Sequence, residues 1–145
     1  MIEPVYFYTP LESYGDFSNF SRRGIDMDGL WWATVEHYFQ AQKFENPQYR
    51  EKIRRASTAK QAAALGRDRT VPLRPDWEAV KVDIMRKAVL KKFQTHAALT
   101  ALLRETGNRP IVENAPGDYF WGCGQDGTGE NWLGRILEDV RKQLA

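Results

Sequence analysis

The chain has 145 residues, of which 42% are hydrophobic and 28% charged, a composition that fits a globular domain and excludes an intrinsically disordered chain. Its formal net charge of +2, from 21 basic and 19 acidic residues, is too small to indicate a protein that wraps duplex DNA. Cys123 is the single cysteine, so no disulfide can form within the chain, and we expect a reducing, cytoplasmic setting.

Sequence signatures of targeting, membrane insertion and cofactor binding are missing. The first ten residues lack a basic region followed by an apolar core, so we expect no signal peptide, and no apolar run has membrane-spanning length. His37 and His96 lie far apart, without Cys/His ligand spacing, and no Walker-type or dinucleotide-binding glycine loop occurs. We therefore expect no metal, no organic cofactor and no membrane partner.

The first half of the chain predicts a strand, a loop, a hairpin and three helices. Residues 4–8 are aromatic and β-branched, as in a strand, and residues 13–20 alternate turn formers with rings. Asp28 and Gly29 are the expected turn of a hairpin over residues 22–32. Three helices are expected next, over residues 34–44 with Thr34 as N-cap, 47–56 starting at Pro47, and 58–65 ending at Gly66.

The second half predicts a long helix, two shorter ones and a glycine-rich loop. A helix is expected over residues 77–93 after Asp76, and another over 96–106 before Gly107. A short strand is expected over 110–114 and a loop over 116–130. The last helix is expected over 132–144, with Asn131 as N-cap. Helix dominates this list. The sequence thus predicts an α+β fold, predominantly helical, with a few short strands in a single domain over residues 1–145.

One candidate site lies in the helix after the tryptophan pair Trp31-Trp32. Glu36, Gln40 and Lys43 share one face, because seven residues at about 100° each fall only about 20° short of two full turns. The alternative is the exposed polar face of an amphipathic helix, but the flanking rings favour a site. Neighbouring rings favour a protonated carboxyl group and a helix N-terminus favours the anion, so either state of Glu36 stays open.

A second candidate site is the glycine-rich loop. Gly122 and Gly124 allow the backbone to approach a ligand closely, Trp121 offers a stacking face, and the helix that starts after Asn131 offers an N-terminus for an anion. The alternative is a flexible surface loop followed by an ordinarily capped helix. Apolar residues inside the loop argue against pure flexibility, since a linker would be polar and rich in serine.

Two smaller features complete the set of candidates. Arg67 and Arg69 follow the end of a helix and can grip a phosphate, although surface ion pairs are the commoner outcome. Asn19 lies in an aromatic loop and can bond a base or sugar, or form an Asx-turn. The ring of His37 points about 100° away from Glu36 around the helix, which indicates a packed or surface histidine rather than a base.

With these segments in view, the sequence resembles the NADAR family of N-glycosidases. The matching blocks run in order from about residue 6 to residue 144 and comprise Tyr14-Gly15-x-Phe17-Ser18-Asn19-Phe20, Trp32-x-Thr34-x-Glu36-His37-Tyr38-Phe39-Gln40-Ala41-x-Lys43-Phe44, Gly66-Arg67, Asp76-Trp77-Glu78, Lys92-Phe93, Asp118-x-x-Trp121-Gly122-x-Gly124 and Asn131-x-Leu133-Gly134-x-x-Leu137. Glu138 stands where the family pattern favours an apolar residue. We expect this difference to be a surface variation.

The resemblance implies cleavage of a C–N bond between ribose and a base or amino group. It implies two substrate classes, namely ribosylamino-pyrimidine phosphates of riboflavin synthesis and ADP-ribose on guanine in nucleic acid. Cleavage of the C–N bond gives the anomeric carbon oxocarbenium character. A carboxylate can stabilise that positive charge or activate the attacking water, and the resemblance implies this role for Glu36. Lys43 would protonate the leaving group or, as a neutral amine, form a Schiff base with the opened sugar.

The resemblance also implies roles for the remaining candidates. Asp118 would orient Lys43 or the ribose hydroxyls, and Trp32 and Trp121 would sandwich the base. Arg67 and the Gly122–Gly124 backbone would hold phosphate. The other expected substrate-binding residues are Asn19, Gln40 and Asn131.

Two further readings of the sequence remain. The same pocket would serve a non-catalytic ADP-ribose or nucleotide sensor, from which the ligand emerges unchanged. A plain interaction domain would use its aromatic residues only as core and would show no nucleotide-induced thermal shift. The sequence leaves the oligomeric state open.

Overall fold

A computed structural model describes residues 3–145 of the chain, and these residues form six α-helices, one 3-10 helix and four short strands. They divide into two compact units. We call residues 22–92 the helical unit and residues 3–21 with 93–145 the strand-pair unit. The mainly helical α+β class predicted from sequence is confirmed.

The helical unit begins with the predicted hairpin. Strands β2 (Ile25–Met27) and β3 (Leu30–Trp32) pair in antiparallel register. Asp28 and Gly29 have φ values of 57° and 78°, the two positive angles that a type I′ turn requires. The turn that the sequence predicted at these two residues is therefore confirmed.

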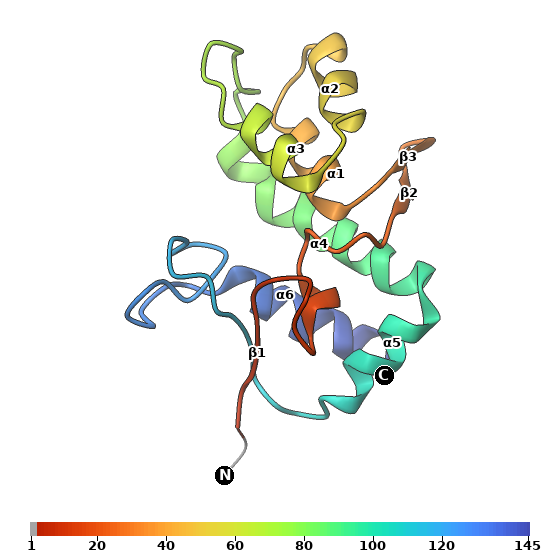
Figure 1. Cartoon of the computed structure of the whole chain (residues 1–145), viewed down its shortest axis with the longest axis vertical. Coiled ribbons are helices and arrows are strands. Elements are labelled where there is room, and N and C mark those ends of the chain that lie inside the picture. Colours follow the sequence, from red (N-terminus) through yellow and green to blue (C-terminus); the bar gives the residue numbers. More distant parts are fainter. Residues whose placement is uncertain (1–2) are drawn as a thin grey trace. The chain divides into compact units, whose positions relative to one another are not determined.

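Three short helices follow and pack together, as Figure 1 shows: α1 (Val35–Gln42), α2 (Pro47–Arg54) and α3 (Ala59–Gly66). Each begins at a side-chain cap, because Thr34, Asn46 and Thr58 accept hydrogen bonds from backbone N–H groups of the first turn. All of α1 is buried, so its polar face is not a solvated surface.

Helix α4 (Trp77–Thr95) is the longest element, and its residues up to Lys92 belong to the helical unit. At its start the ring of Trp77 lies 5.0 Å from that of Phe39, centroid to centroid. This contact ties the beginning of α4 to α1.

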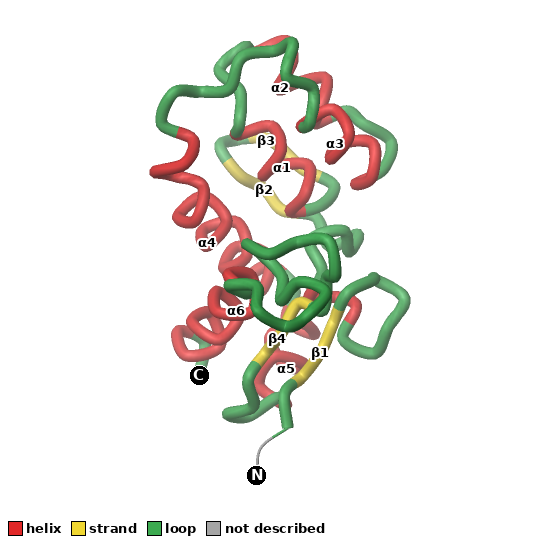
Figure 2. The backbone as a smooth tube through the Cα atoms, turned by 90° about the vertical axis from the view of Figure 1, so that its left-hand side faces the viewer, coloured by secondary structure: helices red, strands yellow, loops and turns green. Residues whose placement is uncertain are grey.

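The strand-pair unit joins the two ends of the chain. Strand β1 (Val5–Phe7) pairs in parallel with β4 (Ile111–Glu113), and the two lie side by side in Figure 2. Helix α6 (Trp132–Gln143) packs on β4 and on α5 (Ala97–Glu105). A one-turn 3-10 helix, Gly15–Phe17, lies inside the predicted loop 13–20.

Aromatic rings form the core of this unit. The ring of Phe17 lies 5.9 Å from that of Phe7 and 5.9 Å from that of Phe93, centroid to centroid. All three side chains are buried, so the 3-10 helix that carries Phe17 is anchored by packing rather than by capping.

Candidate active site

The buried face of α1 carries the first candidate side chains. Glu36 and Gln40 are 8% and 7% exposed, and the Gln40 Nε2 group donates a hydrogen bond of 2.7 Å to Glu36 Oε2. Burial of a carboxylate is costly unless donors or positive charges surround it. The sequence therefore folds a polar pair into the interior, as a site requires.

Lys43 ends the same helix. It keeps helical φ and ψ angles of −64° and −21°, so the spacing that places it on the face of Glu36 holds. Its Nζ lies 5.9 Å from the centroid of the Phe39 ring, and its side chain is half-buried. Burial lowers the pKa of Lys43 to about 8, although the charge of Glu36 acts to raise it.

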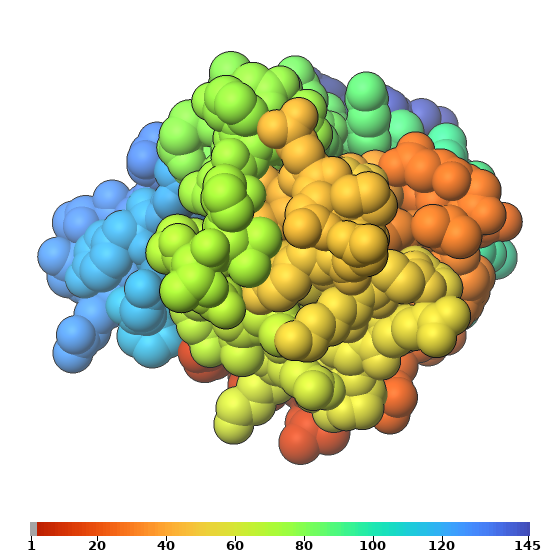
Figure 3. All heavy atoms as spheres, turned by 90° about the horizontal axis from the view of Figure 1, so that it is seen from above, coloured from red at the N-terminus to blue at the C-terminus, as the bar shows by residue number. Residues whose placement is uncertain are grey.

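Three further cations act on Lys43. Arg69, Arg67 and Lys81 each lower the pKa of Lys43 by charge repulsion. Arg69 is anchored, since its Nη1 donates a 2.8 Å hydrogen bond to the Gly66 carbonyl, and Lys81 pairs with Glu78 at 2.7 Å. Figure 3 shows the segment after α3, in green, at the surface of the helical unit beside α2, in gold. The arrangement concentrates positive charge around a weakly basic amine.

His37 fixes the first turn of α1. It is 1% exposed, its Nδ1 lies 2.8 Å from Thr34 Oγ1, and its Nε2 lies 2.9 Å from the Ala56 carbonyl. Because the carbonyl only accepts, Nε2 carries the proton and Nδ1 accepts from the threonine hydroxyl. Burial lowers the pKa of His37. The histidine is packed, and it links α1 to the connection between α2 and α3.

Trp32 belongs to the core of the hairpin. It is 2% exposed, its indole N–H donates to the Met27 carbonyl at 3.0 Å, and its ring meets that of Tyr38 edge-on at 5.2 Å. Tyr38 in turn donates to Asp28 Oδ2 at 3.0 Å. The structure thus gives Trp32 a packing role, which leaves little of its ring for stacking on a base.

The second group of candidates lies in the strand-pair unit. Asp118 Oδ1 accepts hydrogen bonds from the backbone N–H groups of Phe120 at 3.0 Å and Trp121 at 2.8 Å. The rings of Phe120 and Trp121 meet edge-on at 4.8 Å, and Phe120 stacks on Trp132 at 6.1 Å. The loop is therefore held by its own side chains and is not a flexible linker.

The space beside the glycines of this loop is filled by neighbouring residues of the protein rather than left open for a ligand. A Cβ on Gly122 would lie 2.9 Å from the Ala115 side chain and 3.1 Å from the Asp118 carbonyl oxygen. Gly124 has a φ of 74°, and a Cβ there would run into the ring of Tyr119. Both glycines are required by the loop itself, independently of any ligand.

Asn131 precedes α6 but does not cap it, which corrects the expectation from sequence. It adopts left-handed angles (φ 54°, ψ 44°) and makes no side-chain cap hydrogen bond. Its Oδ1 accepts from the Glu113 N–H at 2.9 Å, and its Nδ2 donates to the Ile111 carbonyl at 2.9 Å. The amide is consumed in holding β4 to the start of α6.

Glu138 is partly exposed, as expected of a surface variation, and its carboxylate also bonds β4. Its Oε2 accepts a 2.9 Å hydrogen bond from the Ile111 N–H. An apolar side chain at this position would leave that strand N–H without this partner.

The predicted site residues thus fall into two groups. Those in the helical unit are Trp32, Glu36, Gln40, Lys43 and Arg67; those in the strand-pair unit are Asn19, Asp118, Trp121, Gly122, Gly124 and Asn131. Within the helical unit the structure brings Glu36, Gln40 and Lys43 together on α1. Asn19 is buried, at 7% exposure, just after the 3-10 helix. The sequence did not identify Lys81 as part of this site. Lys81 lies 38 residues after Lys43 on another helix, and no sequence motif links the two residues, although its charge acts on Lys43.

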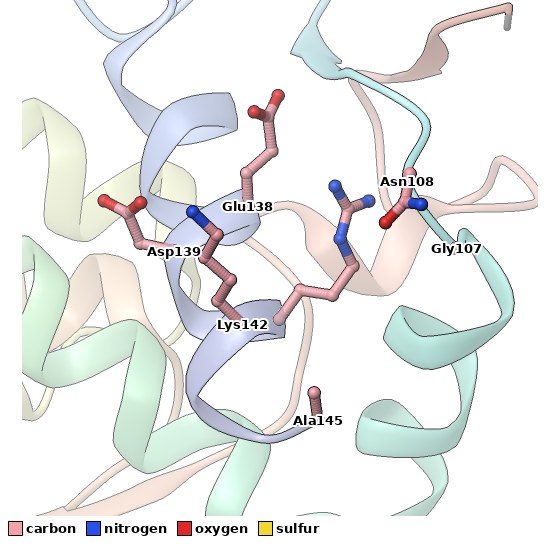
Figure 4. A pocket seen from close by; sticks show the side chains of 7 residues that line it. Gly107, Asn108, Glu138, Asp139, Lys142 and Ala145 are labelled. Carbon is pink, nitrogen blue, oxygen red and sulfur yellow. The ribbon is translucent and has the colours of Figure 1, made fainter.

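A separate cavity of about 230 Å³ lies in the strand-pair unit, and Figure 4 shows it. Its lining residues are Gly107, Asn108, Glu138, Asp139, Arg141, Lys142 and Ala145. None of them is a predicted site residue. Arg141 already donates to Thr106 Oγ1 at 2.9 Å and to the Arg109 carbonyl at 2.8 Å, so its charge serves the fold.

Over residues 3–145, no three His, Cys, Asp or Glu side chains gather as they would around a metal ion. In the same part of the chain, no helix is both long enough and apolar enough to cross a membrane.

The chain is similar to known proteins over nearly its whole length. The NADAR domain profile matches residues 6–145. The chain is 51% identical over 141 residues to the N-glycosidase YbiA of Escherichia coli (strain K12), which covers 97% of this chain and 88% of that protein. It is 42% identical over 144 residues to the riboflavin biosynthesis protein VVA0006 of Vibrio vulnificus, covering 99% of this chain and 39% of that protein. The NMR structure of the E. coli protein YbiA superposes with a TM-score of 0.91 at 50% identity, covering 98% of this chain and 84% of that one. The chain therefore belongs to the NADAR family.

Proposed function

We propose that this chain is an N-glycosidase that hydrolyses the bond between a ribose phosphate and an amino nitrogen, with Glu36 and Lys43 as its catalytic residues. The observation that carries the proposal is the placement of the buried Glu36 carboxyl group and the Lys43 amine, whose pKa burial lowers to about 8, on one face of α1 and its C-terminal cap. Titratable groups with such perturbed environments are typical of active sites. The N-glycosidase relative from E. coli supports the same activity.

The residues suit the bond changes. The C1′–N bond breaks with its electron pair on nitrogen, and positive charge develops on the sugar ring. The Glu36 carboxylate stabilises that charge and takes a proton from the attacking water, whose oxygen bonds to C1′. The Lys43 ammonium gives its proton to the departing nitrogen, and solvent returns the proton from Glu36 to Lys43. Atoms and charge balance without a cofactor.

A second role for Lys43 fits the same pKa. Ring opening leaves the departing nitrogen bound to C1′ as an iminium, to which a neutral lysine amine can add. The base or amine then leaves with the electron pair of its C1′–N bond and a proton, and water hydrolyses the lysine Schiff base that remains. Near pH 8 both the protonated and the neutral form are well populated, so the pKa of Lys43 supports either route.

The cations around Lys43 favour a phosphorylated substrate. Arg67 is exposed at the end of α3, and Arg69 is held beside it by its bond to Gly66. A guanidinium group binds phosphate oxygens bidentately. We assign Arg67 to the substrate phosphate.

The loop residues of the strand-pair unit remain predicted substrate contacts. Asp118 uses one carboxylate oxygen for the loop, and Trp121 is partly exposed. Gly122 and Gly124 remain predicted phosphate contacts through their backbone, whereas the Asn131 amide already bonds β4 and is no longer proposed as a contact. Removal of the Trp121 ring is expected to raise KM more than it lowers kcat, because stacking acts on the bound base before the bond breaks.

The ribosylamino-pyrimidine phosphates are the favoured substrate class, because the Vibrio relative is a riboflavin biosynthesis protein. ADP-ribose on guanine in nucleic acid presents the same kind of C–N bond and is the second class to test.

The test is direct. Purified protein, with EDTA present, is incubated with the ribosylamino-uracil phosphate and, in parallel, with an oligonucleotide that carries ADP-ribose on guanine, and products are followed by LC–MS. We expect free base and ribose phosphate from the first. Glu36→Gln and Lys43→Met should lower kcat/KM at least about 100-fold, whereas the exposed Glu45→Gln and Lys60→Met should not.

Near-normal turnover by Glu36→Gln would remove the catalytic assignment. Cleavage of neither substrate at enzyme concentrations near substrate, together with a ligand-induced rise in Tm, would replace the enzyme with a nucleotide sensor.

A further inference from the structure

The amide of Gln40 lies between the proposed catalytic carboxylate and the end of α3. Its Nε2 donates to Glu36 Oε2 at 2.7 Å. Its Oε1 faces Gly66, where a Cβ would overlap both Oε1 and Cδ of Gln40. Gln40 therefore occupies the space that the missing side chain of Gly66 leaves open.

The direction of the amide suits the chemistry of Glu36. The Nε2 group lies on the side of Glu36 and Oε1 on the side of Gly66, and this direction suits an ionised carboxylate, which only accepts hydrogen bonds. Gln40 Oε1 is buried and has no hydrogen-bond partner within residues 3–145. Leaving a buried acceptor without a partner costs stability, so the arrangement calls for a benefit elsewhere.

We propose that Gln40 is a positioning residue that holds Glu36 ionised and correctly oriented, and that Gly66 is required because only glycine leaves room for this amide. The inference rests on the proposed function, since it assumes that the Glu36 carboxylate acts on the substrate. Gln40 acts through Glu36, because its side chain donates a hydrogen bond to that carboxyl group.

Other charged groups also influence this face. Lys43 interacts with Glu36 by charge, and Arg67, Arg69 and Lys81 surround Lys43 from the end of α3 and from α4. Substitution of Gln40 by methionine leaves all of these cations in place. A change in the pH dependence of Gln40→Met can thus be assigned to the lost amide donor.

The test is the pH profile of kcat/KM on whichever substrate the wild-type protein cleaves. A donor to a carboxylate favours its ionised form, so Gln40→Met should move the acidic limb to higher pH by roughly one unit. On the acid side of the profile, where kcat/KM declines with falling pH, Gln40→Met would then have a kcat/KM about tenfold below that of the wild-type protein. The exposed Gln48→Met on α2 is the matched control and should leave the profile unchanged.

Gly66→Ala tests the second half of the proposal. The added methyl group must displace the Gln40 amide, so this variant should shift the acidic limb in the same direction. In the Gln40→Met background, Gly66→Ala should add little, because the amide it displaces is already gone. Independent, additive effects of the two substitutions would show that Gly66 does not act through Gln40.

The possible outcomes distinguish a failure of the positioning role of Gln40 from a failure of the proposed N-glycosidase function. If the wild-type protein cleaves a substrate and folded Gln40→Met keeps the wild-type acidic limb, the positioning role is wrong while the proposed function stands. If the wild-type protein cleaves neither substrate, the proposed function itself fails. Should Gln40→Met not fold by circular dichroism, Gly66→Ala alone decides, with a shifted limb in favour and an unshifted limb against.

Discussion

At the residue scale, Lys43 carries an amine that changes its charge close to neutral pH. Because burial lowers its pKa to about 8, the neutral and nucleophilic form of the amine grows through the range from pH 7 to pH 9. The Schiff-base route predicts that borohydride, added during turnover, traps a reduced sugar adduct on Lys43, in a yield that rises over this range. Intact and peptide mass spectrometry measure the adduct.

The matched controls are Lys43→Met, which should give no adduct, and Lys60→Met on the exposed side of α3, which should give the wild-type yield. If the wild-type enzyme turns over its substrate and yields no adduct, the Schiff-base route is excluded and Lys43 acts only as a proton donor.

His37 makes a pH-dependent contribution to stability. Its pKa in the folded protein lies below the ordinary value of about 6.5, so the unfolded chain binds more protons as pH falls. The contribution is present above about pH 6.5 and is lost as pH falls toward the lowered folded-state pKa. His37→Gln removes the titration, so its free energy of unfolding, measured in urea, should depend less steeply on pH below 6.5.

The slope of stability against pH decides the assignment. If His37→Gln keeps the wild-type slope below pH 6.5, the assignment to His37 is wrong.

At the scale of elements, the hairpin depends on its turn. Gly29 has a φ of 78° and open space around its Cα, so an added side chain meets no clash and only strains the backbone. Gly29→Ala should destabilise the protein by about 1 kcal/mol. Gly117 also has open space but no positive φ, so Gly117→Ala should be neutral or slightly stabilising in the same thermal melts.

The junction of β4 and α6 depends on Asn131. Replacement by alanine removes both of its hydrogen bonds to β4 and places a less tolerant residue in left-handed angles. We expect a loss of about 2–4 kcal/mol in the free energy of unfolding. Asn108→Ala, at an exposed asparagine of the same unit, should change stability by less than about 0.5 kcal/mol.

At the scale of the whole molecule, the single domain predicted from sequence awaits a test. A single domain of this size unfolds in one cooperative transition. Replacing Trp121 and Trp132 by phenylalanine leaves tryptophans only in the helical unit, whereas circular dichroism reports on helices in both units. We expect both signals from this variant to give the same denaturant midpoint, and separate midpoints would indicate two domains.

The sequence predicted elements better than their connections. Thr34, the Asp28-Gly29 turn and Gly66 marked element ends, because caps and turns depend on a few neighbouring residues. Glu36, Gln40 and Lys43 were placed on one face by helical period alone. The parallel pairing of β1 with β4 escaped prediction, since strands more than 100 residues apart carry no local signal of register.

The same limit explains the errors within the candidate site. Asn131 looks like a helix cap in sequence, and only the tertiary position of β4 shows that its amide is used elsewhere. Glu138 was expected to be a surface variation, and only the tertiary position of β4 shows that its carboxylate accepts a hydrogen bond from the Ile111 N–H. Likewise, no spacing rule links Gln40 to Gly66, because their contact depends on how α1 packs against α3.

The hydrogen bonds to β4 from Asn131, just before α6, and from Glu138, on α6, affect how the protein behaves at high concentration. An outer strand with open N–H and carbonyl groups is a template on which another chain can add, and that is a common route to aggregates. Asn131 and Glu138 occupy such groups of Ile111 and Glu113, so that α6 takes the place of a neighbouring strand. Loss of both side chains would therefore do more than weaken the fold, because it would expose a backbone edge along which copies of the chain can assemble.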